Sequence, residues 1–380
     1  MKMKDWKEYR LGEMIQCNPQ VKLEKGKTYN LIDIDSIEIG SRYVKGKELT
    51  EYDGQSGCHF QNGDTVMARI TPCLENGKIA QVQCESQKGF GSTELFVFRG
   101  TENKTDSNYV FNLMSMQFIR DLAANSMTGA SGRQRADLGF IKRIKWNFPP
   151  LPTQQKIASI LSAYDNLIQN YKKQIKALQT AASELYKEWF VRFRFPGYQT
   201  TKFENGIPEG WKIEKVKNCV NRLPFGQTYK KDELEPEGNV IVIDQSEDEY
   251  LGYHNNEPSH KASAENPIAL FGDHSCKYKL MIKDFSLGEN IIPYTSKGVD
   301  LYYLYYSVYK IVQTEEYKRH WNLFVNKKVL ISNNELQKSF RQKVIPIFKQ
   351  IEILNKQITN LTQQRDLLLP RLMSGKLEVE

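Results

Sequence analysis

Two long stretches of the chain place apolar residues at intervals of four and three positions in turn. The first, within residues 152–190, carries a seam that includes Ile157, Leu161, Ile168, Ile175, Leu178 and Leu185, with Tyr164, Tyr171 and Ala182 in the positions between them. The second, near the C-terminus, carries Ile351, Leu354, Ile358, Leu361 and Leu368, and only Arg365 interrupts its rhythm. Because this alternation keeps one stripe of a helix apolar, it is typical of a coiled coil. The pattern predicts two long helices that pack antiparallel.

The two stretches also share letters. Lys173–Leu178 reads KQIKAL, and Lys356–Leu361, which lies 183 positions later, reads KQITNL. Trp6-Lys7 and Trp211-Lys212 each open a further stretch with an apolar residue five positions after the tryptophan. We therefore expect an internal repeat with pseudo-twofold organisation.

Prolines and a glycine mark the expected ends of the helices. Pro152 suits the first turn of a helix, where its missing N–H costs nothing. Pro346 is expected to separate a short lead-in helix at 335–344 from the long second helix. Gly375 is a plausible residue to end that helix.

The chain is thus predicted to be ordered as domain, helix, domain, helix. The boundaries are 1–150 for the first domain, 151–197 for the first helix and a linker, 198–334 for the second domain and 335–380 for the second helix. Strand-like runs lie at 29–34, 64–70, 95–99 and 240–243, with turn signals between them, whereas 109–124 and 301–317 have helical patterns. The expected fold class is α+β, with two β-rich globular domains separated by two long antiparallel helices.

This geometry suggests contact with DNA. A helix from about residue 153 to 190 would be roughly 55 Å long at 1.5 Å per residue. A turn of B-DNA is about 34–36 Å, so two domains held apart by such helices could each read a short site on one duplex.

Charge is compatible with this interpretation. Lys and Arg exceed Asp and Glu by 53 to 45, a net charge of +8. Residues 151–197 carry 7 basic and 3 acidic groups, and 335–380 carry 8 and 5, so most of the surplus lies on the helices. The chain shows no secretory leader and no apolar run long enough for a membrane helix, and its six cysteines form no C-x-x-C pair. A reducing cytoplasm is the expected location.

Candidate DNA contacts are cationic and amide side chains on loops, because these bind phosphates and read base edges. In the first domain they cluster at 128–135 and 69–78, and in the second at 275–279, 318–321 and 327–328. The candidates are Arg69, Thr71, Lys78, Ser131, Arg133, Gln134, Arg135, Lys277, Lys279, Arg319, His320, Lys327 and Lys328. The alternative for each is an ordinary solvated loop residue.

No motif in the sequence supplies catalysis. There is no acidic residue or Asn followed by Pro-Pro-aromatic, as a methyltransferase needs, and no glycine-rich cofactor or phosphate loop. The E-x-K triplets Glu102–Lys104 and Glu316–Lys318 are expected by chance in so charged a chain. His254, His260, His274 and Cys276 match no zinc-ligand spacing. We predict no catalytic residue and no metal site.

The whole chain resembles the DNA specificity (S) subunit of type I restriction–modification systems. The likeness rests on FPPLPTQQKI at 148–157, LLLPRLMSGKL at 367–377, NGIPEGWK at 205–212 and ARITPCLENGK at 68–78. It implies two target recognition domains, each reading half of a bipartite DNA sequence, and helices that set the spacer and bind two modification (methyltransferase) subunits. Restriction subunits with translocase and nuclease activity would join, and S-adenosylmethionine, ATP and Mg would belong to those partners.

Two further hypotheses remain open on the residues alone. The chain could be a coiled-coil scaffold whose ends bind other proteins, or, less favoured, a nuclease or stand-alone methyltransferase. Salt-sensitive, sequence-specific DNA binding in a complex would separate the first from the leading hypothesis. Activity of the isolated chain would reveal the second.

Overall fold

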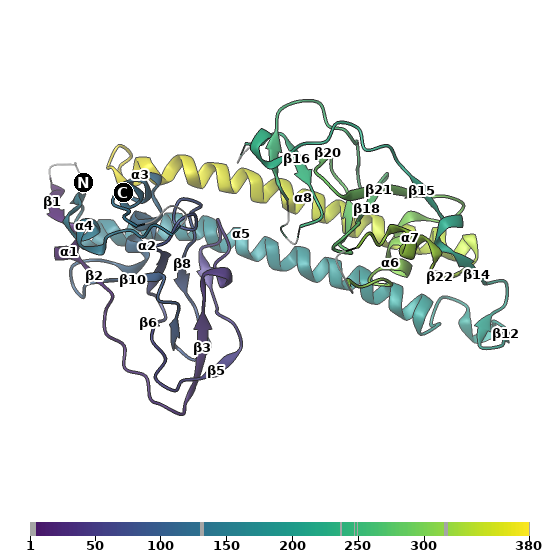
Figure 1. The fold of residues 1–380 in the computed structure, drawn as a ribbon, viewed down its shortest axis with the longest axis horizontal. Helices are drawn as coiled ribbons and strands as arrows, with labels where there is room; N and C mark the ends of the chain where they lie inside the picture. Colours follow the sequence, from purple (N-terminus) through teal and green to yellow (C-terminus); the bar gives the residue numbers. More distant parts are fainter. Residues whose placement is uncertain are drawn as a thin grey trace. The chain divides into compact units, whose positions relative to one another are not determined.

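The computed structural model describes residues 5–129, 133–235, 238–246, 248, 250–314 and 318–379. The chain divides into two compact units, one made of Met1–Asn170 with Ile358–Glu380 and the other of Tyr171–Gln357. We call these unit 1 and unit 2. Helix α5 (Leu151–Tyr186) begins in unit 1 and ends in unit 2, and α8 (Asn334–Met373) does the reverse (Figure 1). Each unit therefore contains a globular head and part of both helices.

The head of unit 1 is built on two sheets. One has the order β2 (Ile15–Cys17), β10 (Leu95–Gly100), β7 (Thr65–Ala68), β8 (Ile79–Val82) and β4 (Tyr43–Val44). The other has the order β5 (Leu49–Glu51), β3 (Thr28–Ile32), β9 (Lys88–Gly91) and β6 (Cys58–Gln61). The strands β1 (Lys7–Arg10) and β11 (Lys145–Phe148) pair separately, and the helices are α1 (Leu11–Met14), α2 (Ser107–Ser115), α3 (Gln117–Asn125) and α4 (Leu138–Arg143).

The head of unit 2 repeats this plan. Its larger sheet has the order β15 (Val220–Arg222), β21 (Ile291–Ser296), β18 (Ile268–Gly272) and β19 (Tyr278–Met281). The smaller one has the order β17 (Gly252–His254), β16 (Val240–Ile243) and β20 (Phe285–Leu287). The pairs β12 (Phe203–Glu204) with β13 (Ile207–Pro208) and β14 (Lys212–Lys215) with β22 (Lys328–Ile331) complete the strands, and α6 (Leu301–Val308) and α7 (Trp321–Asn326) are the short helices. A π-helical turn at Lys187–Val191 continues α5, and 3-10 turns lie at Ile34–Ser36, Tyr198–Thr200, Val216–Asn218 and Lys231–Glu233.

The internal repeat is visible in the element bounds. Adding 183 to the bounds of α4, β11 and the start of α5 gives the bounds of α7, β22 and the start of α8. In the smaller sheets, β3 pairs parallel with β9 and antiparallel with β5, as β16 does with β20 and β17. The prediction of an α+β fold with two similar β-rich heads and two long helices is thereby confirmed.

A glutamine in the first turn of each long helix fastens the helix to its head. Gln154 accepts a hydrogen bond from the backbone N–H of Asp106 (3.1 Å) and donates to the Pro149 carbonyl (2.9 Å). Gln337, which is 183 positions later, accepts from the N–H of Asp300 (2.8 Å) and donates to the Ser332 carbonyl (2.8 Å). Both aspartates cap the following helix with their carboxylates.

The helices bury the predicted seam in two clusters. In unit 1, Ile157 and Leu161 pack with Leu372 of α8 in the main core of that head, and Leu368 is half-buried against it. In unit 2, Ile351 lies in the head's core, with Ile175, Leu178 and Leu185 half-buried beside it. Ile168 and Leu354 are buried, and Ile358 and Leu361 are half-buried.

Some boundaries differ from the sequence predictions. Pro346 does not end a lead-in helix, because α8 runs unbroken through it; the flanking Val344 and Phe348 are buried, and their packing offsets the backbone hydrogen bond that proline lacks. The helix expected at 109–124 is two helices, since Met116 takes an extended conformation between α2 and α3. The helix expected at 301–317 ends at Val308.

Candidate nucleic-acid interface

In unit 1, the β7–β8 loop (69–78) lies against the described segments 127–129 and 133–136. The Thr71 N–H donates to the Gln134 carbonyl at 3.0 Å, and the Ala136 N–H donates to the Arg69 carbonyl at 2.8 Å. Thr128 and Arg135 exchange two further backbone hydrogen bonds. Four predicted DNA contacts (Arg69, Thr71, Gln134 and Arg135) thus come together from distant parts of the sequence.

The cation of Arg135 in this cluster is already paired. Its guanidinium binds both carboxylate oxygens of Glu94, with Nε 2.9 Å from Oε2. The hydrogen bond from Arg135 lowers the pKa of Glu94. Arg135 is exposed, as is Arg133 two residues earlier. An approaching phosphate could therefore compete with Glu94 for the guanidinium of Arg135.

Arg69 is the cation of this loop with unused hydrogen-bonding capacity. Its guanidinium lies over the Phe96 ring, 4.9 Å from the centroid, and its Nε is buried without a hydrogen-bond partner among the described residues. Arg69 also lines a cleft of about 450 Å³, together with Asn18, Lys22 and His59. The cleft brings amide, cationic and apolar groups to the edge of the loop pair, which suits contact with a nucleotide.

Two other candidates in unit 1 are occupied by local contacts. The Lys78 ammonium donates to the Ile34 carbonyl at 3.1 Å and lies 3.6 Å from the Asp35 carboxylate. The Thr71 hydroxyl donates to Glu75 at 3.2 Å. Ser131 lies outside the described residues.

Unit 2 has the equivalent loop pair. The β18–β19 loop meets the segment leading to α7, where the His320 N–H donates to the Asp273 carbonyl at 2.7 Å and the Thr314 hydroxyl to the Ser275 carbonyl at 2.9 Å. Arg69 follows β7, and its N–H donates to the carbonyl of Glu94, the residue before β10. Asp273 follows β18, and its N–H donates to the carbonyl of Asn290, the residue before β21. The two residues therefore occupy equivalent positions in the two heads.

Within this second loop pair, the cations differ in their freedom. The Lys277 ammonium donates to the carbonyls of Ser246 and Asp248, both at 2.6 Å, so it holds down a neighbouring loop. Lys279 is half-buried on β19. Arg319 has 78% of its side chain exposed, and its Nε lies 3.8 Å from the Asp273 carboxylate.

One assignment is corrected by burial. His320 is 0% exposed, and its ring Nδ1 lies 3.1 Å from the Asp273 carbonyl. It precedes the first residue of α7 and packs under the loop, so it supports the loop from below instead of facing solvent. The neighbouring cations in the sequence made it look exposed.

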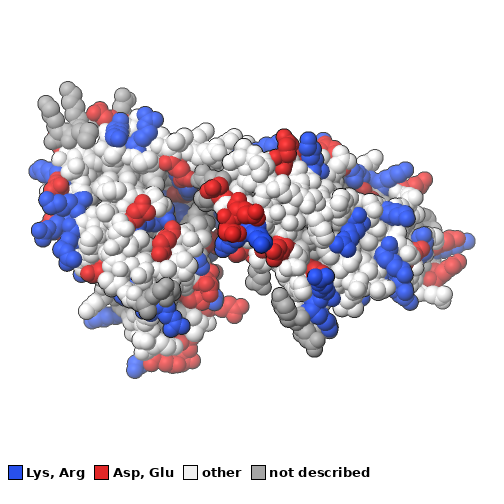
Figure 2. All heavy atoms as spheres, turned by 45° about the horizontal axis from the view of Figure 1, so that its top comes forward, with Lys and Arg blue, Asp and Glu red and all other residues white. Residues whose placement is uncertain are grey.

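The remaining pair lies elsewhere. Lys327 directly follows α7, and Lys328 is the first residue of β22, where it pairs with Lys215 of β14. They are not part of the β18–β19 loop pair. On the face drawn in Figure 2, blue Lys and Arg atoms are interspersed with red Asp and Glu atoms on both units and form no single continuous stripe.

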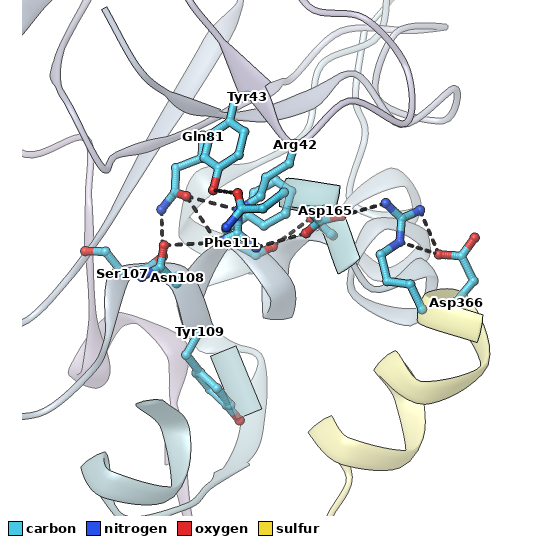
Figure 3. A network of polar contacts seen from close by, with 12 residues as sticks. Arg42, Tyr43, Gln81, Ser107, Asn108, Tyr109, Phe111, Asp165 and Asp366 are labelled. Atoms are coloured by element: carbon cyan, nitrogen blue, oxygen red, sulfur yellow. Dashed lines mark hydrogen bonds and ion pairs between the residues drawn. The ribbon is translucent and has the colours of Figure 1, made fainter. Parts of the chain in front are cut away.

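A buried polar network in unit 1 was not foreseen from the sequence. Arg42, with 1% of its side chain exposed, donates to Asp165 of α5 at 3.0 Å and to Asn108 of α2 at 2.9 Å (Figure 3). Asp165 also accepts from Arg365 of α8 at 2.8 Å. The signal available in the sequence was Arg365 itself, since a charge on an apolar seam needs a buried partner.

These observations define a protein with two similar heads, each presenting an equivalent pair of loops, on two long helices. Residues 3–180 match the family model described as the type I restriction modification DNA specificity domain. This part of the chain therefore belongs to the family of type I restriction modification DNA specificity domains.

Its relatives include the type I restriction enzyme MjaIX specificity subunit of Methanocaldococcus jannaschii, 27% identical over 72% of this chain and 68% of that protein. The EcoAI specificity subunit of Escherichia coli is 33% identical over 33% of this chain and 22% of its own length. The crystal structure of the type I restriction-modification system S subunit from M. genitalium shares the fold, with a TM-score of 0.50, 15% identity, and coverage of 97% and 96% of the two chains. No helix in the described part of this chain is long and apolar enough to span a membrane.

Proposed function

We propose that this chain is the DNA sequence-recognition subunit of a type I restriction–modification complex. Each head reads one half of a bipartite site, and the chain itself performs no catalysis and carries no cofactor. The observation that carries the proposal is the loop pair that recurs at the same place in both heads with different side chains, Arg69 in one and Asp273 in the other. The specificity subunits among its relatives support the same conclusion.

The partners we propose are double-stranded DNA, two modification subunits and restriction subunits, which would supply S-adenosylmethionine, Mg and ATP chemistry. The long helices support subunit docking, because they leave large apolar side chains in solvent. Ile160 and Leu167 of α5 are 38% and 37% exposed, and Ile353 and Leu367 of α8 are 49% and 71% exposed.

Methylome sequencing tests the reading role. The gene for this chain is expressed with its modification subunit in a host that lacks both, and the methylated motif is compared with that of Arg69→Ala. We expect the variant to relax or lose one half of the motif while the other half stays unchanged, because Arg69 belongs to one head only. Lys7→Ala on β1 is the matched control, as Lys7 is exposed but lies outside the loop pair. An unchanged motif in Arg69→Ala would contradict this assignment.

A second experiment tests whether the helices set the spacer. The deletion removes one heptad from each helix, residues 171–177 of α5 and 353–359 of α8, which lie at equal sequence separations from the Asp165–Arg365 ion pair. Deleting both removes about 10 Å from each helix, roughly three base pairs of B-DNA, while turning its surface by only about 20°. The preferred spacer should shorten by about that amount, and an unchanged spacer would refute the role of the helices.

The scaffold hypothesis predicts a different result. If the heads bound only proteins, the reconstituted complex would methylate no defined motif through this chain, and its DNA affinity would not fall with salt as phosphate contacts require.

A further inference from the structure

The place where α5 and α8 cross is polar in unit 1 and apolar in unit 2. In unit 1, Asp165 of α5 meets Arg365 of α8 at 2.8 Å. The offset of 183 maps Asp165 onto Phe348 and Arg365 onto Ala182. Phe348 and Ala182 are 6% and 0% exposed and belong to one hydrophobic cluster of unit 2.

The heads are matched to these crossings. In unit 1, Asn108 of α2 accepts a hydrogen bond from Arg42, which also binds Asp165. The residue at the same position of α6, two after the capping aspartate, is Tyr302, and its ring packs on Phe348 with centroids 4.7 Å apart. In unit 1, charged residues of the helices therefore bind polar residues of the head. In unit 2, an aromatic residue of α8 packs on an aromatic residue of the head.

We infer that Asp165 and Arg365, together with Phe348 and Ala182, make the two helices of one chain select each other over the same helices of a second copy. A repeat protein of this kind has an alternative pairing, in which α5 of one chain packs on α5 of another and α8 on α8. Such exchange between equivalent elements is the basis of domain swapping.

Both charge and size disfavour the alternative. An α5–α5 crossing would place Asp165 against Ala182, which leaves one carboxylate oxygen without its cation and the site underfilled. An α8–α8 crossing would place Arg365 against Phe348, two large side chains with no carboxylate from the partner helix. The pairing within one chain instead joins Asp165 to Arg365 in unit 1 and places Phe348 and the small Ala182 in one hydrophobic cluster of unit 2. Buried polar groups are known to set helix register and partner in this way.

Arg365→Ala is the sharpest test, because it removes the preference of this contact for α5–α8 pairing over α5–α5 or α8–α8 pairing. In this variant, positions 182 of α5 and 365 of α8 are both alanine. Asp165 and Phe348 would therefore each meet an alanine whether α5 packs on α8 or each helix packs on its own copy. Asp165 keeps its ion pair with Arg42, which preserves the charge balance of the head. Two differently tagged populations of the full chain are unfolded together, refolded at high concentration, and analysed for mixed-tag dimers by native mass spectrometry.

Wild type should refold as a monomer, and Arg365→Ala should raise the mixed-dimer fraction at least about tenfold, the equivalent of one charge-assisted hydrogen bond. Arg371→Ala, an exposed arginine of the same helix, should behave as wild type. Phe348→Ala separates specificity from stability: it removes more buried surface but keeps the Asp165–Arg365 preference, so it should unfold more easily and still not form mixed dimers.

Two outcomes would overturn the inference. One is an Arg365→Ala protein that forms no more mixed dimer than wild type. The other is a Phe348→Ala protein that mixes as much as Arg365→Ala, which would make simple destabilisation the cause. Neither outcome bears on DNA recognition, so this inference stands or falls separately from the proposed function.

Discussion

Asp165→Asn should destabilise unit 1 far more than a single conservative change usually does. The Asp165 side chain is 4% exposed and accepts from Arg42 at 3.0 Å and from Arg365 at 2.8 Å. The other hydrogen-bond acceptors of the Arg42 guanidinium, Gln81 and Asn108, are neutral (Figure 3). The amide therefore leaves Arg42 as a buried cation whose hydrogen-bond acceptors among the described residues are all neutral.

The size of the effect follows from that burial. Breaking a buried ion pair by removing one partner costs about 3–5 kcal/mol, because the remaining charge stays desolvated. At 1.4 kcal/mol for each factor of ten, the opening equilibrium of unit 1 should rise between about a hundredfold and a few thousandfold.

Hydrogen–deuterium exchange measures this unit by unit. Peptides from α2, whose Tyr109 and Leu113 are 0% exposed, should exchange faster by that factor, whereas peptides from α6 in unit 2 should be unaffected. Asp366→Asn is the matched control, since the Asp366 side chain is 50% exposed, and its effect should stay within about 0.5 kcal/mol. Arg42→Met combined with Asp165→Leu and Arg365→Met should recover much of the loss, because apolar replacement of a whole buried set of charges is often neutral. Equal exchange in Asp165→Asn and Asp366→Asn would refute the reasoning.

Three further predictions concern the heads. Gln154→Ala should destabilise unit 1 and Gln337→Ala should destabilise unit 2, each by about 1–3 kcal/mol, because each change leaves a backbone N–H and a carbonyl unsatisfied. Faster hydrogen–deuterium exchange in unit 2 for Gln154→Ala, or in unit 1 for Gln337→Ala, would contradict this. Arg319→Ala should weaken DNA binding by the reconstituted complex and lower its salt slope by about one if the residue contacts phosphate, whereas His320→Asn should mainly reduce the stability of unit 2. Burial lowers the pKa of His254 and His260 in the folded chain. As the pH falls, both imidazoles are therefore protonated at a higher pH in the unfolded chain than in the folded one. Unit 2 should therefore lose stability as the pH falls below about 6.5, and a denaturation midpoint that is flat between pH 7.5 and 5.5 would argue against it.

The helices and the repeat could be predicted from the sequence because both are local patterns. The 4–3 spacing depends only on which residues face one stripe, and KQIKAL and KQITNL align at a constant offset. The heads were harder, because the offset is 183 from α4 onward but 194 between α2 and α6, judged by their capping aspartates. Insertions between strands break the letter match although the strand order is kept.

Site residues were predictable by type and not by contact. The sequence predicted the loop stretches at 69–78 and 128–135 as candidate DNA contacts from their donors, and it gave no sign of the backbone hydrogen bonds between them. Whether a lysine ammonium is available depends on distant carbonyls: Lys277 donates to the carbonyls of Asp244, Ser246 and Asp248, about thirty positions away. The burial of His320 likewise follows from the packing of α7 on the β18–β19 loop. These are tertiary facts, which composition and spacing do not encode.

The comparison of the two heads separates what holds the fold from what varies on it. The groups that satisfy the backbone are the same in both: the glutamine of the first helical turn and the aspartate that caps the next helix. The loop side chains are not. Where unit 1 places Arg69, with an Nε that has no partner among the described residues, unit 2 places Asp273, which accepts from the Trp321 N–H at 2.9 Å and lies near Arg319. A cation at that position favours acceptors on a base edge or phosphate, and a carboxylate disfavours them. The two heads share a backbone fold but carry opposite charges at equivalent loop positions, so we expect them to read different half-sites. The methylated motif should then be asymmetric, and a palindromic motif would contradict this assignment of the loops.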